Sequence, residues 1–256
     1  LRSAAPAATA GITLNLTPIE AHRGLAAYAD HVRRMDGLSN RIFLDPVLRG
    51  RYPADVLADT AHLVGGLSAD GLPDFVHDGD LALIGAPIDF LGINYYFPTV
   101  VAAGPFPGAM DLVPGYGGRP RTAMGWEVDP TAITGLLRRL HEEYGDLPLY
   151  ITENGSAFDD VVTGAAPDGT GGQVHDPQRL DYLQRHLAAC VDARRAGVDL
   201  RGYFAWSLLD NFEWAEGYAK RFGLVHVDFA TQERRVKDSG RWFADFLGGS
   251  ASDQPA

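Results

Sequence analysis

The segment LYITENG (149–155) constrains the fold of this chain more than any other. Apolar and β-branched residues lead directly into the carboxylate of Glu153, and Asn154 and Gly155 then provide a turn. This pattern predicts a short buried strand that ends at Glu153. In barrels of alternating strands and helices, side chains at the C-terminal ends of the strands form the active site. The same residues also fit a strand that merely stops at an exposed glutamate, so this segment alone does not decide between the two.

A second segment, YFAWSLLDNFEWAEGY (203–218), places Trp206, Glu213 and Trp214 within nine residues. Tryptophan offers a flat apolar surface and one N–H donor, and a carboxylate accepts hydrogen bonds from neighbouring hydroxyls. An isolated tryptophan is usually a core residue, but an unpaired glutamate between aromatic residues is costly to bury. The segment therefore favours a surface that binds a sugar, which has apolar C–H faces and a fringe of hydroxyls.

Strand-like and helical segments alternate four times, which predicts the α/β class with a parallel sheet covered by helices. Two helices are expected to start at Asp129-Pro130 and Asp176-Pro177, an N-cap residue followed by proline at the first helical position. A hairpin is expected around 222–236 and a disordered tail at 248–256. The expected strands are 11–16, 88–96, 149–153 and 202–207, and the expected helices are 20–37, 54–63, 130–144, 177–196 and 239–247.

Two long loops rich in glycine and proline, 97–121 and 156–175, each follow the C-terminal end of an expected strand. Loops of this length inside a compact domain are usually functional, and in a barrel they would form the rim of a substrate pocket. A loosely ordered surface loop is the alternative for each of them.

Composition excludes several classes of protein. The formal net charge of −11 argues against nucleic acid or an anionic membrane as a partner. Cys190 is the single cysteine, so no disulfide forms within the chain, and its apolar helical context indicates a buried thiol. No apolar run is long enough to span a membrane, and cytoplasmic residence is the default expectation.

Other kinds of chemistry find no support in the sequence. The histidines show no metal-ligand spacing, and no glycine-rich stretch is followed by the GK[ST] of a phosphate cradle, so neither a metal nor a cofactor is expected. Asp159, Asp160 and Asp210 are interpreted as turn or solvent-facing residues without a chemical role.

The two informative segments together resemble glycoside hydrolase family 1, the β-glucosidase family. Its nucleophile motif, ITENG, occurs here at 151–155, and its signature WSLLDNFEW occurs letter for letter at 206–214. Weaker matches in family order are GITLNLTP (11–18), FLDPVLRGRYP (43–53), DFLGINYY (89–96), TAMGWEVDP (122–130) and KRFGLVHVD (220–228). The resemblance extends from about residue 10 to residue 247 and implies a (β/α)8 TIM barrel.

The resemblance also implies that part of the barrel is missing. In the family, the general acid/base is the glutamate of an Asn-Glu-Pro motif at the end of the fourth strand, and these 256 residues contain no Asn-Glu-Pro. GITLNL normally forms the fifth strand. We therefore expect residues 1–247 to be the C-terminal half of the catalytic barrel, about four βα units, whose partner is the missing N-terminal half.

By resemblance, Glu153 is the catalytic nucleophile, and the hydroxyl of Tyr96 donates a hydrogen bond to it. Asn94 is expected on the same strand face as Tyr96, because side chains two residues apart share a face. Strand propensity alone is the alternative explanation for Tyr95 and Tyr96.

The resemblance assigns the remaining site residues to sugar binding. Glu213 would bind the hydroxyls at positions 4 and 6 of the non-reducing sugar, and Trp214 the hydroxyl at position 3. Trp206 would stack beneath the ring, Phe222 would line the site, and Trp126 would contact the leaving-group side, with simple packing as the alternative for Trp126.

Two functions remain open at this point. The chain is the nucleophile half of a retaining β-glucosidase that acts on a β-glucoside or a short β-linked oligosaccharide, with galactosyl and fucosyl substrates as variants. Alternatively, it is a catalytically incomplete half-barrel that binds sugar or supports a separate N-terminal half. Phospho-sugar members of the family usually have serine in place of Glu213, so an uncharged sugar is favoured.

Overall fold

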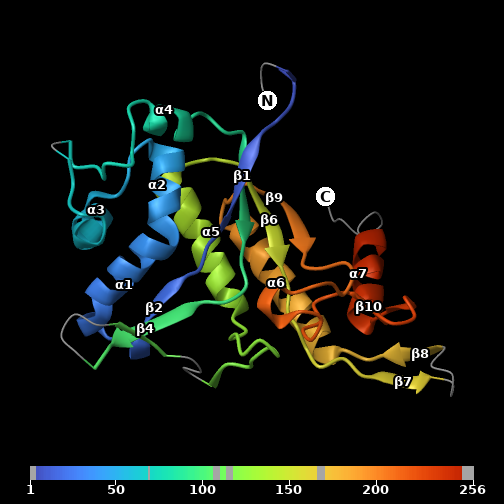
Figure 1. Cartoon of the computed structure of the whole chain (residues 1–256). Helices are drawn as coiled ribbons and strands as arrows, with labels where there is room; N and C mark the ends of the chain where they lie inside the picture. The colour runs from blue at the N-terminus through green and yellow to red at the C-terminus, as the bar shows by residue number, and fades with distance from the viewer. Residues whose placement is uncertain (1–3, 69, 106–109, 114–117, 166–170, 250–256) are drawn as a thin grey trace.

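The computed structural model describes residues 4–68, 70–105, 110–113, 118–165 and 171–249 (Figure 1). At its centre is a sheet of four parallel strands in the order β1–β3–β6–β9. These strands are Gly11–Asn15, Phe90–Asn94, Leu149–Asn154 and Leu200–Ala205. Each strand is followed by helical segments, so the predicted α/β class and its four βα units are confirmed.

Helices make the connections between the parallel strands. Helix α5 (Pro130–Tyr144) connects β3 to β6, α6 (Pro177–Arg195) connects β6 to β9, and α7 (Asp238–Gly249) follows β9 and a hairpin. Between β1 and β3 lie α1 (Ala29–Asp36), the π-helical turn η3 (Gly37–Arg41), α2 (Ile42–Arg49), α3 (Ala54–Thr60) and α4 (Asp80–Ile84). Single 3₁₀ turns are η1 (His22–Gly24), η2 (Ala26–Tyr28), η4 (Ala61–Leu63) and η6 (Trp214–Glu216).

Small sheets occupy both long segments that the sequence analysis assigned to loops and the start of one expected helix. Strands β2 (Ile19–Ala21), β4 (Thr99–Ala103) and β5 (Met110–Leu112) form one sheet, and β7 (Val162–Ala165) pairs with β8 (Gly171–Val174). The helix expected at 20–37 therefore begins only at Ala29. The expected hairpin is present as β10 (Val225–Val227) and β11 (Arg234–Val236). Of the expected tail, 248–249 extend α7, and 250–256 lie outside the described residues.

The two Asp-Pro helix starts differ. Asp129 caps α5 as expected, since its Oδ1 accepts hydrogen bonds from the backbone N–H of Thr131 at 2.9 Å and of Ala132 at 3.3 Å. Asp176 makes no cap bond to α6. Its carboxylate accepts instead from the backbone N–H and hydroxyl of Ser239, at 2.9 and 2.5 Å, and so ties the start of α6 to α7.

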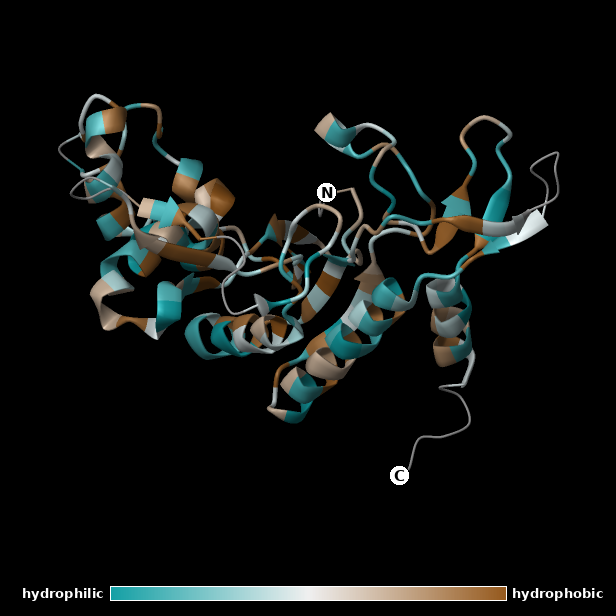
Figure 2. Cartoon of the chain, turned by 90° about the horizontal axis from the view of Figure 1, so that it is seen from below, coloured by the Kyte–Doolittle hydropathy of each residue, from teal (hydrophilic) through white to brown (hydrophobic). Residues whose placement is uncertain are grey.

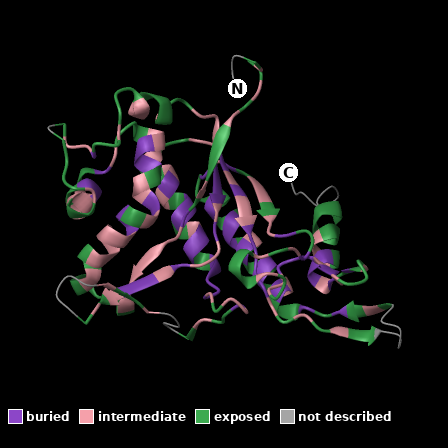
Figure 3. Ribbon diagram, in the orientation of Figure 1, coloured by how far each residue is buried: buried purple, intermediate pink, exposed green. Residues whose placement is uncertain are grey.

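The hydrophobic core lies between one face of the central sheet and helices α2, α5 and α6. Figure 2 shows apolar and polar residues alternating along the helices, as expected for helices with one buried side. Figure 3 shows buried residues along β3 and β6, whereas β1 at the edge of the sheet is largely exposed. The principal core residues are Leu91, Ile93, Ile133, Leu137, Leu149, Ile151 and Cys190, so the predicted buried thiol is confirmed.

A register shift in the sheet determines where Glu153 points. Ile93 pairs with Ile151 and Asn94 pairs with Glu153, so Thr152 is an additional residue in β6. Strict alternation would place Glu153 on the same face as the fully buried Ile151, inside the core. The inserted residue turns Glu153 to the opposite face, which it shares with Asn94.

A buried network of ion pairs joins distant parts of the chain. Lys237 Nζ is fully buried and lies 2.5 Å from Asp160 and 2.9 Å from Asp210. Arg221 contacts the other oxygen of Asp210 at 2.7 Å. The network is electrically balanced, because its carboxylates are Asp160, Asp176 and Asp210 and its cations are Arg179, Arg221 and Lys237.

The interpretation of Asp160 and Asp210 as turn or solvent-facing residues is therefore wrong, whereas Asp159 is exposed as expected. Asp210 also accepts hydrogen bonds from the backbone N–H groups of Gly223 at 2.9 Å and Val227 at 3.3 Å. Its counter-charge comes from Lys237, 27 residues further along the chain. Only the folded chain brings these groups together.

We predict that Asp210→Asn lowers the free energy of unfolding by about 3–5 kcal/mol, because it leaves buried cations without a full counter-charge. Burial opposes ionisation of Asp210, but Lys237 and Arg221 outweigh it and hold the pKa of this carboxyl below its ordinary 3.8. Its stabilisation is thus complete above pH 3.8 and is lost as the pH falls through the lower pKa of the folded state.

Urea unfolding at pH 6 and in acid would measure this effect. The difference between wild type and Asp210→Asn should be large at pH 6 and should narrow below pH 3.8. Asp199→Asn, which removes an exposed ion pair with Arg201, is the matched control and should have no measurable effect. A difference that stays constant down to the acid transition would contradict the prediction.

Candidate active site

A cavity of about 500 Å³ opens at the C-terminal ends of the four parallel strands. Asn15, Asn94 and Glu153 lie at the ends of β1, β3 and β6, and Trp206 directly follows β9. All eight residues predicted for the site line this cavity: Asn94, Tyr96, Trp126, Glu153, Trp206, Glu213, Trp214 and Phe222. The fold thus brings together residues that are up to 207 positions apart, from Asn15 to Phe222.

Glu153 and Tyr96 form a short polar contact in the cavity wall. The hydroxyl of Tyr96 donates to Glu153 Oε2 at 2.6 Å. Burial of the phenol, together with this hydrogen bond, raises the pKa of Tyr96 far above its ordinary value. The phenol therefore stays protonated at any working pH and remains a donor to the carboxylate.

Asn94 lies beside this pair on the same face of the sheet. Its Oδ1 accepts a hydrogen bond from the hydroxyl of Thr152 at 2.7 Å, which fixes the orientation of the amide. Thr152 is the additional residue of β6, so the register shift that turns Glu153 into the cavity also orients Asn94. Tyr95, by contrast, points into the core, and its hydroxyl donates to the backbone carbonyl of Asp129 at 2.7 Å.

Aromatic rings form one wall of the cavity. The ring centroid of Trp126 lies 5.3 Å from that of Tyr96, 5.0 Å from that of Phe97 and 5.8 Å from that of Phe222. Such tilted contacts pack the rings against one another. Trp126 thus has packing partners and also lines the cavity.

The segment from Trp206 to Phe222 forms the opposite side. The side chain of Trp206 hydrogen-bonds to Glu213, and Glu213 is partly buried. Burial raises the pKa of Glu213, the bond from Trp206 opposes this rise, and the nearby charge of Glu153 adds to it. Trp214 is 83% exposed, so it has no packing role within the described chain.

Contacts outside the cavity hold this segment in place. Lys220 Nζ donates to the carbonyl of Ala123 at 2.7 Å and so joins the segment to the loop that carries Trp126. Asp210 and Arg221, at its two ends, belong to the buried ion network.

The sequence analysis missed four residues that line the cavity: Asn15, Phe97, Asn211 and Phe212. A signal existed for Asn15, because it ends its strand as Asn94 and Glu153 end theirs. Of the two long loops expected at the rim, 97–121 contributes Phe97. The described part of 156–175 includes the paired strands β7 and β8 and contributes no lining residue.

The described part of the chain contains no cluster of three or more histidine, cysteine, aspartate or glutamate side chains that could hold a metal ion. Within the same residues, no helix combines the length and the apolar composition that a membrane crossing requires.

Comparison with known proteins relates this geometry to one family. The model of the family described as glycosyl hydrolase family 1 matches residues 2–250. The chain is 48% identical over 233 residues to a bifunctional β-D-glucosidase/β-D-fucosidase from Bifidobacterium breve, an alignment that covers 86% of this chain and 48% of the relative. It is 46% identical over 218 residues to β-glucosidase A from Thermotoga maritima, covering 84% and 45%, respectively.

Solved structures give the same result. The GH1 β-glucosidase from Exiguobacterium antarcticum B7 superposes with a TM-score of 0.88 at 40% identity and covers 100% of this chain and 54% of its own. The β-glucosidase from Thermotoga maritima in complex with deoxynojirimycin superposes with a TM-score of 0.81 at 41% identity, covering 96% and 52%. The chain spans about half the length of the relatives it matches.

Proposed function

This chain belongs to glycosyl hydrolase family 1 and forms about half of a (β/α)8 barrel, and on that premise we propose that it is the nucleophile-bearing half of a retaining β-glucosidase. The observation that carries the proposal is the hydrogen bond of 2.6 Å from Tyr96 to Glu153 inside a cavity lined by Trp206, Glu213 and Trp214. It combines a rigidly placed carboxylate with a surface suited to a sugar.

In the proposed reaction, Glu153 attacks the anomeric carbon of the sugar. A bond forms from its carboxylate oxygen to that carbon, the glycosidic C–O bond breaks, and the departing oxygen takes a proton from a second carboxylic acid. That group then removes a proton from water, which attacks the same carbon and releases Glu153. The two carboxyl groups of a retaining enzyme stand ~5–5.5 Å apart.

The second carboxylic acid is proposed to come from the other half of the barrel. Among the described residues that line the cavity, Glu153 and Glu213 are the only carboxylates. We assign Glu213 to the sugar hydroxyls, because it lies between two tryptophans on the segment opposite Glu153 and hydrogen-bonds to Trp206. The same assignment follows from the family signature.

The proposed substrate is a terminal, non-reducing β-D-glucosyl residue, with galactosyl and fucosyl residues as variants. The Bifidobacterium breve relative is named for both glucosidase and fucosidase activity. In this site, Trp206 would support the apolar face of the ring, Trp214 and Glu213 would bind hydroxyls, and Trp126 would contact the leaving group. Asn94 would bind near the position of attack.

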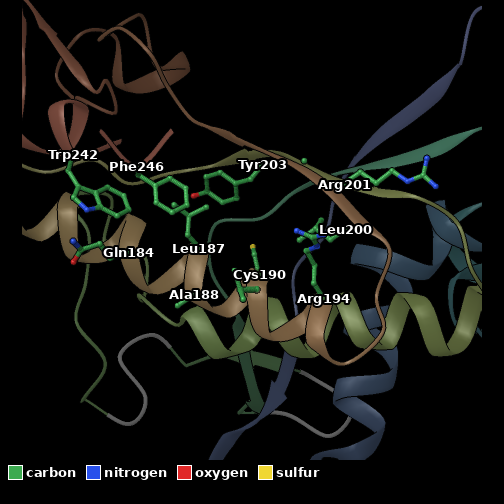
Figure 4. A pocket seen from close by; sticks show the side chains of 12 residues that line it. Gln184, Leu187, Ala188, Cys190, Arg194, Leu200, Arg201, Tyr203, Trp242 and Phe246 are labelled. Atoms are coloured by element: carbon green, nitrogen blue, oxygen red, sulfur yellow. The ribbon is translucent and has the colours of Figure 1, made fainter. Parts of the chain in front are cut away.

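The proposed partner is a set of strands that completes the barrel. Within the described residues, β1 and β9 have no partner on their outer edges, and Phe204 of β9 is 58% exposed. Beside β9, a mainly apolar groove of about 390 Å³ lies between α6 and α7 (Figure 4). Trp242 and Phe246 of α7 and Leu187 of α6 line it, and a further βα unit paired with β9 would cover them.

The alternative function, a half-barrel that binds sugar without turnover, is favoured by one observation. The described residues of the cavity wall include aromatic and hydroxyl-binding groups suited to a sugar, but among them only Glu153 is a carboxylate beside the assigned sugar ligand Glu213. The two functions differ in whether a completed barrel turns over substrate.

We predict that a 2-deoxy-2-fluoro-β-glucoside with a good leaving group labels Glu153 in the complete barrel, because the fluorine slows hydrolysis of the glycosyl-enzyme. Mass spectrometry of peptides would locate the label. Glu153→Gln should abolish both labelling and turnover, whereas Glu216→Gln, which changes a nearby exposed glutamate, should retain both. A label on another carboxylate would contradict the assignment.

We predict that Glu213→Ala lowers kcat/KM for p-nitrophenyl β-glucoside by about 10²-fold or more, because hydrogen bonds to the sugar are lost at the transition state. The loss should be smaller for p-nitrophenyl β-D-fucoside, which has no hydroxyl at position 6. Steady-state kinetics on both substrates would measure the ratio. Equal losses of kcat/KM for the two sugars would contradict the assignment of a contact between Glu213 and the hydroxyl at position 6.

We predict that residues 1–256 alone do not hydrolyse p-nitrophenyl β-glucoside at a useful rate, since general acid catalysis alone contributes typically ~10²–10⁴-fold. Coexpression with an N-terminal half-barrel should restore activity and yield a larger species in sedimentation. A monomer of 1–256 that is cooperatively folded and fully active would contradict the half-enzyme proposal.

A further inference from the structure

Asn154, the residue after the proposed nucleophile, is completely buried on the core side of the sheet. All of its side-chain hydrogen-bonding groups are engaged. Oδ1 accepts from the hydroxyl of Tyr203 at 2.6 Å, and Nδ2 donates to the carbonyl of Tyr95 at 2.8 Å and to the hydroxyl of Tyr182 at 2.9 Å. A carbonyl can only accept, so the bond to Tyr95 fixes which way the amide points.

These bonds connect every strand that carries a principal site residue. Tyr95 precedes Tyr96, and the hydroxyl of Tyr182 also lies 3.4 Å from the carbonyl of Tyr96. The carbonyl of Asn154 accepts from the backbone N–H of Trp206 at 2.9 Å. Asn154 thus sets the spacing between the backbones of Glu153, Tyr96 and Trp206.

The next residue shows how closely these backbones approach. A Cβ atom on Gly155 would lie 1.7 Å from the carbonyl oxygen of Trp206, so the position requires glycine. The close approach leaves no room for the end of β6 to shift relative to β9.

The hydrogen bonds of Asn154 also stabilise the register shift of β6. Thr152 is the inserted residue, Glu153 faces the cavity, and Asn154 returns to the core side. A slip of one residue would exchange the faces of Glu153 and Asn154. An amide with three specific partners on the core side opposes that slip, because a carboxylate there could not donate to the carbonyl of Tyr95.

The groups around Asn154 carry no charge at neutral pH. Burial raises the pKa values of Tyr182 and Tyr203 well above the ordinary value, so both hydroxyls keep their protons. The ring of His186 stacks on Tyr182 at 3.8 Å, and burial lowers the pKa of His186 to about 4. Asn154, Tyr182 and Tyr203 therefore position the end of β6 through the geometry of their hydrogen bonds and not through charge.

We propose that Asn154, held by Tyr203 and Tyr182, is a positioning residue that aims Glu153 and Tyr96 at the anomeric carbon. The proposal rests on the proposed function of Glu153 as nucleophile. The Tyr203 hydroxyl lies on the far side of the sheet from the substrate. Under this proposal, it affects the rate of attack by Glu153 and has little effect on sugar binding.

The test is Tyr203→Phe in the complete barrel, with Tyr144→Phe as the matched control. Tyr144 also donates its hydroxyl at 2.6 Å to a buried partner, Asp45, but lies at the end of α5 away from the cavity. Tyr203→Phe should lower kcat by about tenfold to 10²-fold, since small misplacements of reacting groups have effects of this size, with KM within about threefold. The rate of trapping by the 2-deoxy-2-fluoro-β-glucoside should fall in parallel, and Tyr144→Phe should change neither.

Three outcomes would contradict either the positioning role of Asn154 or the proposed function of Glu153, and the measurements distinguish them. A Tyr203→Phe protein with wild-type kcat and trapping rate removes the positioning role alone. A fall in kcat that matches the loss of labelled sites at saturation reflects a smaller folded fraction and also removes it. Failure of the wild-type complete barrel to be labelled at Glu153 removes the proposed function itself.

Discussion

The buried ion network of Lys237, Asp160 and Asp210 is the interaction on which the arrangement of the site depends. It joins the segment after β6, the segment that bears Trp206 and Glu213, and the start of α7, parts of the chain that share no sheet hydrogen bonds. Buried ion pairs contribute little net stability compared with apolar packing, but they accept only one arrangement of partners. In this chain they hold the segment that bears Trp206 and Glu213 in register with the strand that ends at Glu153 and Asn154.

Much of the fold could be predicted because the information is local. Three of the four parallel strands, β1, β3 and β6, are short, mainly apolar runs that end at asparagine, and the start of α5 at Pro130 follows from the Asp129 cap. The prediction that Asp176 caps α6 was wrong, because its carboxylate is engaged elsewhere. Its competing partner Ser239 lies 63 residues away and is brought near only by folding. Strands β2 and β4 escaped prediction because β2 lies at the start of an expected helix, β4 lies in a long segment rich in glycine and proline, and the two are stabilised by pairing with each other.

In the site, too, some features could be predicted from local sequence and others depend on contacts between distant residues. Motif resemblance was enough to name eight of the twelve described residues that line the cavity, and strand-end position would have added Asn15. The direction in which Glu153 points was a different matter, because strict alternation places it in the core. The extra residue, Thr152, depends on pairing with β3, and Asn154 stabilises that pairing through Tyr203 and Tyr182. None of these contacts has a signature in the sequence around Glu153.

The chain has only two lysines, and the structure engages both: Lys237 is sealed in the ion network and Lys220 donates to the carbonyl of Ala123. Apart from its histidines, its other basic side chains are arginines, whose guanidinium groups stay protonated far into the alkaline range. Surface ion pairs such as Arg139–Glu143 therefore do not titrate where lysine pairs would begin to fail. Reagents that acylate amines, and proteases that cleave after lysine, would find few accessible side chains on the folded protein.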